Sequence, residues 1–146
     1  MAETPDTFER IHASFARQTM MKTLGAQLLD VTAGKVVIGS DIAPHILQQH
    51  GFAHAGVAFS IGDSAAGYAA LSQMPDGAEV LTAEMKINLL APAQGQRLEA
   101  TGRVIKSGKR LVVVSATVVA IDSDIRRDIA VLQGTMVPHF PKNHAG

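Results

Sequence analysis

The first half of the chain changes from a helical to an alternating pattern of apolar positions. Large apolar residues recur at roughly helical spacing near the N-terminus: Phe8, Ile11, Phe15 and Met20 or Met21. This spacing predicts an amphipathic helix over residues 4–22. Two segments rich in Val, Leu and Ile, 25–31 and 35–43, then favour two strands joined by the short turn TAGK. A polar loop over 44–53 follows them.

The second half begins with a nearly apolar segment and continues in long β-rich runs. Residues 54–74 consist mostly of small and apolar side chains up to the sequence PDG, which predicts a buried helix. Runs rich in Val, Ile, Leu and Thr then predict four strands: 79–91, 96–106, 109–122 and 126–138. Short turns favour antiparallel neighbours, and an apolar helix must be covered nearly all round. We therefore expect an α+β fold in which a curved antiparallel sheet wraps around the long helix, with residues 1–146 forming one domain.

The composition excludes several classes of function. Of the 146 residues, 47% are apolar and 18% charged, and 13 basic residues balance 13 acidic ones, so nothing indicates binding to nucleic acid or an anionic membrane. The chain contains no cysteine, which excludes disulfides, thiolate metal sites and a cysteine nucleophile. It shows neither a basic leader before an apolar stretch nor about 20 successive apolar residues, so we expect a cytoplasmic protein without a membrane span.

A single carboxylate, Asp63, stands inside the apolar segment. No other acid and no Lys or Arg lies within residues 42–75. One interpretation is a capping box, in which the helix begins at Ser60 and Asp63 reaches back to the Ser60 amide. The other starts the helix near His54, where the first-turn N–H groups lack an evident cap because residues 52–56 contain no Ser, Thr, Asp or Asn. Such free N–H groups suit a carbonyl oxygen that becomes negative during a reaction.

A helix that begins near His54 separates two candidate groups along its axis. Ala55, in the first turn, and Asp63 are eight residues apart, which is about 12 Å of helix. An Asp side chain cannot span that distance, so a reaction that used both groups would need Asp63 from a second chain, with the two helices antiparallel across a two-fold axis. Small residues in the segment would allow such close packing: Ala58, Gly62, Ala65, Ala66 and Ala69.

These residues resemble the hotdog-fold acyl-CoA thioesterases, in particular the PaaI-type and 4-hydroxybenzoyl-CoA thioesterase branch. That family shows an Asn or Gln, six residues later the His of a His-Gly-Gly, and an Asp or Glu nine residues after that His; Gln48, His54 and Asp63 have this spacing. The segments VLTAEMKINLLAPA, VIKSGKRLVVVSATVV and IAVLQGTMVP resemble the family's later strands, so the resemblance covers about residues 24–138. Ala55 replaces the first Gly of the motif; its N–H remains, but the added methyl group would narrow the thioester slot.

The resemblance implies a hotdog fold, here with an extra N-terminal helix, that hydrolyses an acyl-CoA thioester to a carboxylate and free CoA. It also implies a homodimer that often pairs into a tetramer. The Ala55 amide, with Gly56 supporting the turn, would polarise the thioester carbonyl, and Asp63 of the opposite subunit would act as nucleophile or general base. Gln48 would orient the thioester or the water, and Thr82 matches a position where some members hold a hydroxyl near the attacking water.

The other polar candidates lie at a turn and in the loop before the long helix. In the family, basic residues near such a turn meet the CoA phosphates; in the turn KSGKR these would be Lys106, Lys109 and Arg110, with Gly108 letting the backbone approach. The alternative interpretation of this turn is a solvated hairpin tip. His54 is expected to pack and hydrogen-bond at the helix start rather than to act as a base. His45, His50 and His54 have no Cys or acid beside them, so we expect no metal and no cofactor.

Three functions follow from the sequence, and they differ in what they require. The first is the thioesterase. The second is a non-catalytic hotdog domain that binds or senses acyl-CoA. The third, a hotdog hydratase or dehydratase, is disfavoured because no suitably placed His–acid pair exists. The sequence does not identify the acyl group, whose pocket Phe59, Tyr68 and the N-terminal helix could border.

Overall fold

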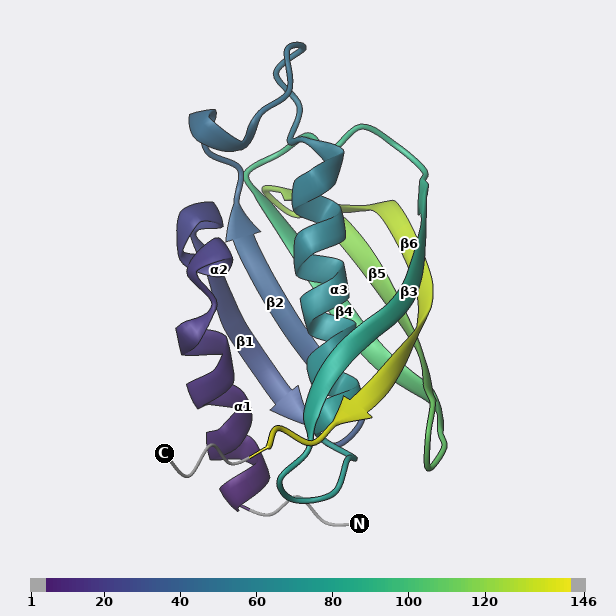
Figure 1. Cartoon of the computed structure of the whole chain (residues 1–146). Helices are drawn as coiled ribbons and strands as arrows, with labels where there is room; N and C mark the ends of the chain where they lie inside the picture. The colour runs from purple at the N-terminus through teal and green to yellow at the C-terminus, as the bar shows by residue number, and fades with distance from the viewer. Residues whose placement is uncertain (1–4, 143–146) are drawn as a thin grey trace.

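The computed structural model describes residues 5–142, in which one curved antiparallel sheet wraps around a long helix (Figure 1). The helices are α1 (Pro5–Arg17), α2 (Thr19–Leu24) and α3 (Ala55–Leu71), with a 3-10 turn at Pro44–Ile46. The strands are β1 (Ala26–Thr32), β2 (Lys35–Asp41), β3 (Glu79–Leu89), β4 (Arg97–Ser107), β5 (Val112–Asp122) and β6 (Ile125–His139). Across the sheet their order is β1-β2-β4-β5-β6-β3, so that β1 and β3 form its edges. The expected α+β class and the curved antiparallel sheet around a long helix are confirmed.

The continuous N-terminal helix expected over residues 4–22 is wrong, because the chain leaves the helix at Gln18. Residue 4 lies outside the described residues. Gln18 has an extended backbone (φ −77°, ψ 98°), and α2 starts directly after it. Ile11 and Met21 are both buried, yet ten residues of unbroken helix would turn their side chains about 80° apart. The break at Gln18 lets both side chains reach the same core.

The small residues of α3 pack against the sheet of their own chain. A Cβ at Gly62 would lie 3.0 Å from the Leu132 side chain of β6, and a Cβ at Gly102 of β4 would collide with the backbone of Ala65. Glycine at both positions therefore lets helix and sheet approach closely. The five small residues singled out in the sequence are all buried there, rather than facing a partner's helix as expected: Ala58, Gly62, Ala65, Ala66 and Ala69.

The C-terminal end of α3 is closed by a side chain from α1. The expected helix over 54–74 begins one residue later than expected, at Ala55, and ends three residues earlier, at Leu71. The Arg10 guanidinium donates to the carbonyl oxygens of Leu71 at 3.2 Å and Pro75 at 3.3 Å. Carbonyl groups in the last turn of a helix lack partners within the helix, so this contact stabilises the helix end and ties α1 to it.

A β-bulge in β3 turns its side chains at the point nearest α3. The register of β3 against β6 shifts between Thr82 and Glu84. Before the shift, the Thr82 hydroxyl contacts α3; beyond it, Met85 packs against the core, while the Glu84 carboxylate accepts a hydrogen bond from the Thr135 hydroxyl at 2.8 Å. The extra residue, Ala83, therefore allows a polar side chain to reach α3 from a strand whose next inward residue is apolar.

Candidate active site

The N-terminal end of α3 presents one unoccupied backbone N–H. His54 precedes the helix in an extended conformation (φ −61°, ψ 140°), and its Nδ1 accepts the Gly56 N–H at 2.8 Å. The Val57 N–H donates to the His54 carbonyl oxygen at 2.9 Å, whereas the Ala55 N–H has no acceptor among residues 5–142. The expected lack of a cap is therefore wrong at Gly56, where His54 supplies one. The Ala55 N–H, which was expected to face the thioester, remains available.

Asp63 lies about two turns further along α3, and its hydrogen-bond partner comes from β3. The Thr82 hydroxyl donates to Asp63 Oδ1 at 2.7 Å. The Ser60 hydroxyl donates to the Gly56 carbonyl oxygen at 2.7 Å, within the helix. The capping-box interpretation is wrong, because α3 begins at Ala55 and the Ser60 amide is already inside the helical hydrogen-bond ladder.

The surroundings of Asp63 make its carboxylate a stronger base than an exposed one. Burial raises the pKa of Asp63 above its ordinary value of 3.8, and the hydrogen bond from Thr82 counteracts part of that rise. Burial removes water from the charged form and disfavours it, whereas a donated hydrogen bond favours it. A carboxylate with a raised pKa that stays accessible from a pocket is suited to accept a proton near neutral pH.

The expected site residues line two separate pockets. Gln48, His54 and Ala55 line one of about 540 Å³, the Ala55 pocket, whose wall is largely apolar. Asp63 and Thr82 line another of about 200 Å³, the Asp63 pocket. The eight residues between Ala55 and Asp63 keep their backbones about 12 Å apart along the axis of α3. The structure thus brings Asp63 to Thr82, and Ala55 to His54 and Gln48, but does not bring the two groups together.

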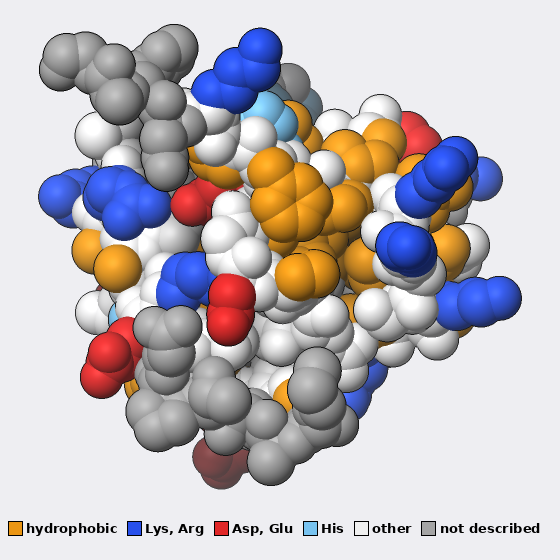
Figure 2. Space-filling view, turned by 60° about the horizontal axis from the view of Figure 1, so that its bottom comes forward, with side chains coloured by type: hydrophobic (Ala, Val, Ile, Leu, Met, Phe, Trp, Pro, Cys, Tyr) orange, Lys and Arg blue, Asp and Glu red, His pale blue; other side chains and the backbone are white. Residues whose placement is uncertain are grey.

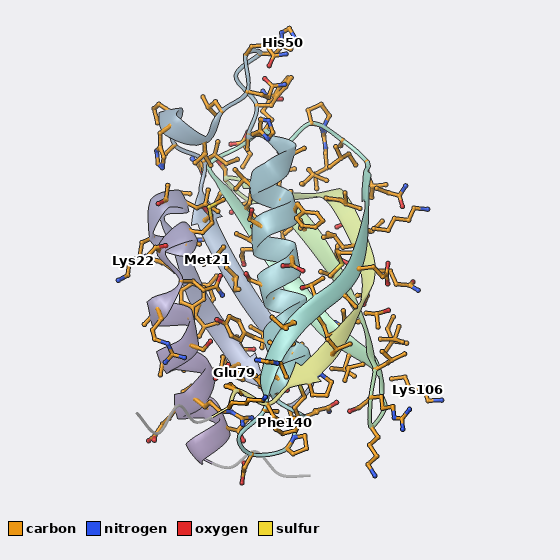
Figure 3. All side chains as sticks on the ribbon, in the orientation of Figure 1. Met21, Lys22, His50, Glu79, Lys106 and Phe140 are labelled. Carbon is orange, nitrogen blue, oxygen red and sulfur yellow. The ribbon has the colours of Figure 1, made fainter. Side chains whose placement is uncertain are left out.

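The Gln48 side chain is held by its own loop. Its Oε1 accepts the backbone N–H groups of His50 and Phe52, the second at 3.4 Å. The loop protrudes beyond the N-terminal end of α3, with His50 near its tip (Figure 3). The Nε2 group of Gln48 keeps both of its N–H donors, so any contact between Gln48 and a ligand in the Ala55 pocket would be made by that nitrogen.

The basic residues of the β4–β5 hairpin lie near the other end of α3. Lys106, Lys109 and Arg110 are exposed, and none of them pairs with an acid within residues 5–142. In Figure 2, Lys and Arg side chains stand out at the side of the molecule where this hairpin lies, and Figure 3 shows Lys106 pointing outward there. Gly108 and Lys109 line a pocket of about 260 Å³ with residues 73–75, which follow α3. Their contact with CoA phosphates stays a prediction.

Within the part of the chain that the structure describes, no cluster of three His, Asp or Glu side chains could hold a metal ion. No helix of that part is long and apolar enough to cross a membrane.

Sequence reasoning missed the polar side chains that α1 and its end bring beside Asp63. Ser14 and Gln18 line the Asp63 pocket and hydrogen-bond to the Tyr68 hydroxyl, at 3.0 Å and 2.7 Å. Of the groups that could border the acyl pocket, Tyr68 and the N-terminal helix line the Asp63 pocket and Phe59 does not. Their contact with an acyl group stays a prediction. The sequence held a signal, because Ser14 and Gln18 are four residues apart and the helix predicted over residues 4–22 would place them on one face, beside the apolar residues.

Comparisons with known proteins identify the family. The family model described as Thioesterase superfamily matches residues 50–125, more than half of the chain. The crystal structure of a thioesterase family protein from Silicibacter pomeroyi is 39% identical with a TM-score of 0.90, covering 92% of this chain and 99% of that one. The acyl-coenzyme A thioesterase PaaI of Escherichia coli is 28% identical over 77% of this chain and 79% of its own length. The structure of E. coli PaaI has a TM-score of 0.84 at 24% identity, covering 94% and 96% of the two chains, and supports the fold. The chain belongs to the thioesterase superfamily and has the hotdog fold of its PaaI-type branch.

Proposed function

We propose that the protein hydrolyses an acyl-CoA thioester to a carboxylate and free CoA, in a site that two subunits build together. Its family supports the activity, and the name of the E. coli relative supports acyl-CoA as the substrate class. One observation carries the proposal: a half-buried carboxylate, Asp63, is held by Thr82 in one pocket, while the unoccupied Ala55 N–H lies at another. These are the base and the oxyanion donor that thioester hydrolysis needs.

The proposed reaction uses Asp63 of one subunit and Ala55 of the partner subunit. The thioester carbonyl oxygen accepts the Ala55 N–H, which stabilises the negative charge that develops there. Asp63 removes a proton from a water molecule whose oxygen attacks the carbonyl carbon. Alternatively, its own carboxylate attacks that carbon and forms a mixed anhydride as the thiolate leaves, and water then hydrolyses the anhydride. In both forms the C–S bond breaks, and the CoA thiolate takes up a proton. Thr82 keeps Asp63 Oδ1 in place, so the other carboxylate oxygen remains for the reaction.

A single turnover in ¹⁸O-labelled water distinguishes the two forms of the reaction. With enzyme in excess over substrate, a general base places one label in the product carboxylate during that turnover. A nucleophilic Asp63 forms a mixed anhydride; when water attacks the Asp63 carboxyl carbon, the product takes an unlabelled oxygen from Asp63 and the label remains on the protein.

The bare edge of the sheet supports a second copy of this chain as the partner. β1 is flanked by α1 and α2, whereas no strand or helix of residues 5–142 covers the outer edge of β3 (Figure 1). β3 is eleven residues long, and Leu81 and Leu89 on it are 53% and 57% exposed. An uncovered strand of that length readily pairs with another strand. Antiparallel pairing of two β3 strands across a two-fold axis would place the two α3 helices side by side in opposite directions.

The remaining expected site residues take roles at the ends of the substrate. We propose that Lys106, Lys109 and Arg110 contact the CoA phosphates, because they are exposed cations without an acidic partner in the described chain. Gln48 would donate from Nε2 to the thioester or to the attacking water, while His54 holds the first turn of α3 through Gly56.

Thiol release from hexanoyl-CoA, measured with a chromogenic disulfide, tests the function. The wild-type protein should turn over and elute as a dimer or larger species. Leu81→Glu brings a charge to the strand that the partner would cover in the proposed pairing, and it should lower both dimer content and activity. Ile125→Glu is the matched control, because Ile125, the first residue of β6, is 67% exposed and does not lie on β3. Tight binding of hexanoyl-CoA without thiol release would contradict the proposal and favour an acyl-CoA-binding domain.

A further inference from the structure

The hairpin that joins β4 to β5 carries a local excess of positive charge. The whole chain has 13 basic and 13 acidic residues, and from that balance no binding to an anionic membrane was expected. Residues 100–121, however, contain four basic residues and no acid. Three of the four lie at the tip of the hairpin, where every residue from 105 to 111 is exposed: Lys106, Lys109 and Arg110. The balance of the whole chain therefore hides a cationic tip.

A β-bulge in β4 turns one of these cations away from the core. Val104 pairs with Val114 and packs against the core, and the register then shifts so that Ile105 is an extra residue. Strict alternation would give Lys106 the inward orientation of Val104. The bulge instead pairs Lys106 with Val113 on the outer face of the sheet. Figure 3 shows the Lys106 side chain pointing outward.

Two aliphatic side chains flank the cations at the same tip. Ile105 and Leu111 are 56% and 54% exposed. The Gly108 N–H donates to the Leu111 carbonyl oxygen at 2.9 Å, and a Cβ at Gly108 would lie 2.6 Å from that oxygen, so glycine permits the tight turn. Singly exposed aliphatic side chains are common on protein surfaces. This tip combines two of them with three cations, which needs an explanation of its own.

Acids of the neighbouring elements do not pair with the tip. From Lys106, the register runs through Val113 and Thr135 to Glu84, which is three strand spacings or about 14 Å away. The screening length is about 10 Å at an ionic strength of about 0.1 M. Asp76 lies in the turn after α3, but no ion pair joins it to the hairpin among residues 5–142. The positive charge of the tip is therefore available to an external partner.

The turn between β5 and β6 provides a comparison within the same chain. Ile125 there is 67% exposed and is followed by two arginines, but three aspartates lie in the same segment, 122–128. Arg126 also approaches Glu99 Oε2 at 3.9 Å. Both hairpins thus expose aliphatic and basic side chains, and only in the β4–β5 hairpin does no acid accompany them.

We propose that the tip of the β4–β5 hairpin, residues 105–111, docks reversibly on an anionic lipid bilayer. Each Lys or Arg near such a surface raises the affinity about fivefold, and aliphatic side chains gain by leaving water at the interface. The tip is a narrow projection at the lower right of Figure 1, whereas each partner in a stable protein–protein interface covers about 800 Å². Its shape, its charge and its aliphatic side chains therefore fit a lipid surface.

Co-sedimentation with lipid vesicles tests the docking. The wild-type protein should bind vesicles of equal parts phosphatidylglycerol and phosphatidylcholine at low salt, and high salt should release it. Binding to vesicles of phosphatidylcholine alone should be at least about tenfold weaker, because these vesicles carry no net charge. Vesicle binding needs no turnover, so the result does not depend on the proposed thioesterase function.

Two charge variants connect the binding to the tip. Lys106→Ala combined with Lys109→Ala should lower the partition coefficient about 25-fold, which is about fivefold for each cation. Arg126→Ala combined with Arg127→Ala is the matched control, because it removes the same charge from the other hairpin. It should lower the partition coefficient by less than about twofold.

Two aliphatic variants test whether the side chains enter the interface. Ile105→Ser combined with Leu111→Ser should lower the partition coefficient at least about fivefold, because less apolar surface leaves water. Their KM for hexanoyl-CoA without vesicles should be unchanged, since the proposed CoA contacts are the cations. Ile125→Ser is the control for an exposed aliphatic side chain outside the tip. A thermal melt of each variant shows that the fold is kept.

Three outcomes would overturn the proposal. The first is no binding to the anionic vesicles, or equal losses in the two charge variants. The second is unchanged vesicle binding when Ile105 and Leu111 are both replaced by Ser. The third is a smaller oligomer in that variant without vesicles, measured by size-exclusion chromatography with light scattering, since the tip would then contact another copy of this chain.

Discussion

The first turn and the middle of α3 carry opposite chemistry on one helix. At the first turn, the Ala55 N–H adds to the partial positive charge of a helix N-terminus, and Ala55 lines a largely apolar pocket. Two turns on, Asp63 brings a negative charge into a polar pocket and keeps it there through Thr82. The pocket at Ala55 lacks a carboxylate, and the pocket at Asp63 lacks a free helix N-terminal N–H. The difference indicates two half-sites, which antiparallel pairing of two chains would join twice.

Of the variants that test the two half-sites, Asp63→Asn should have the largest effect on activity. It removes the base and leaves a side chain of the same shape, so kcat should fall by about 10²–10⁴-fold. Burial disfavours the charged Asp63, so the amide should leave the melting temperature at pH 7 equal or higher. Thiol release and a thermal melt provide both measurements. Asp76→Asn, in an exposed turn, is the control, and substantial activity in Asp63→Asn would exclude Asp63 as the base.

Ala55→Pro removes a single backbone N–H, the proposed oxyanion donor at the first turn of α3. Proline is well tolerated at the first helical position, and His54 already has the φ of −61° and ψ of 140° that a residue before proline favours. The fold should persist, while kcat falls by about 10²–10³-fold, the usual loss for one oxyanion donor. Ala55→Gly keeps the N–H and should retain or increase activity. A normal kcat in Ala55→Pro would show that the oxyanion is stabilised elsewhere.

Thr82→Val changes the surroundings of Asp63, and we expect a smaller effect on activity. The hydrogen bond from Thr82 lowers the Asp63 pKa, so its loss should raise that pKa further. Activity requires the carboxylate, and it should therefore fall on acidification at a higher pH in Thr82→Val than in the wild type. On the alkaline plateau we expect a loss of about tenfold or less. A pH profile of kcat/KM measures both, with Thr135→Val on β6 as the control. An unshifted acid limb would mean that another group controls it.

Removing basic residues from the β4–β5 hairpin should have the smallest effect. Exposed charges contribute little each, so Lys109→Ala should raise KM for acyl-CoA by only about two- to fivefold at low salt. The same acyl group on pantetheine, which lacks the CoA phosphates, should show no such change. Equal effects on both substrates would assign Lys109 a structural role rather than a phosphate contact.

The fold was largely predictable from the sequence because its elements have strong local patterns. The strand positions and the α3 start agree with the structure to within a few residues. The break at Gln18 was not predictable from local spacing, because it depends on bringing Ile11 and Met21 into one core. The packing of the small residues of α3 on their own sheet was equally hidden, since glycine at 102 on another strand makes the close approach possible.

The candidate site was predictable only in part, for a physical reason. The spacing of Gln48, His54 and Asp63 is a linear feature, and a resemblance to a family can be recognised from it. The cap that His54 provides, and the polar cluster around Tyr68, depend on rotamers and on contacts between distant segments. The one-domain organisation, the tetramer and the cytoplasmic location stay predictions.

Mixing two inactive variants tests the central claim, a site shared between subunits, most directly. Ala55→Pro and Asp63→Asn chains are denatured together at equal amounts, refolded and assayed for thiol release. A mixed dimer holds one site with two wild-type groups and one with none, so random pairing should restore about one quarter of the wild-type activity per chain. Activity no higher than that of the separate variants, with mixed dimers demonstrated by mass spectrometry, would contradict a shared site.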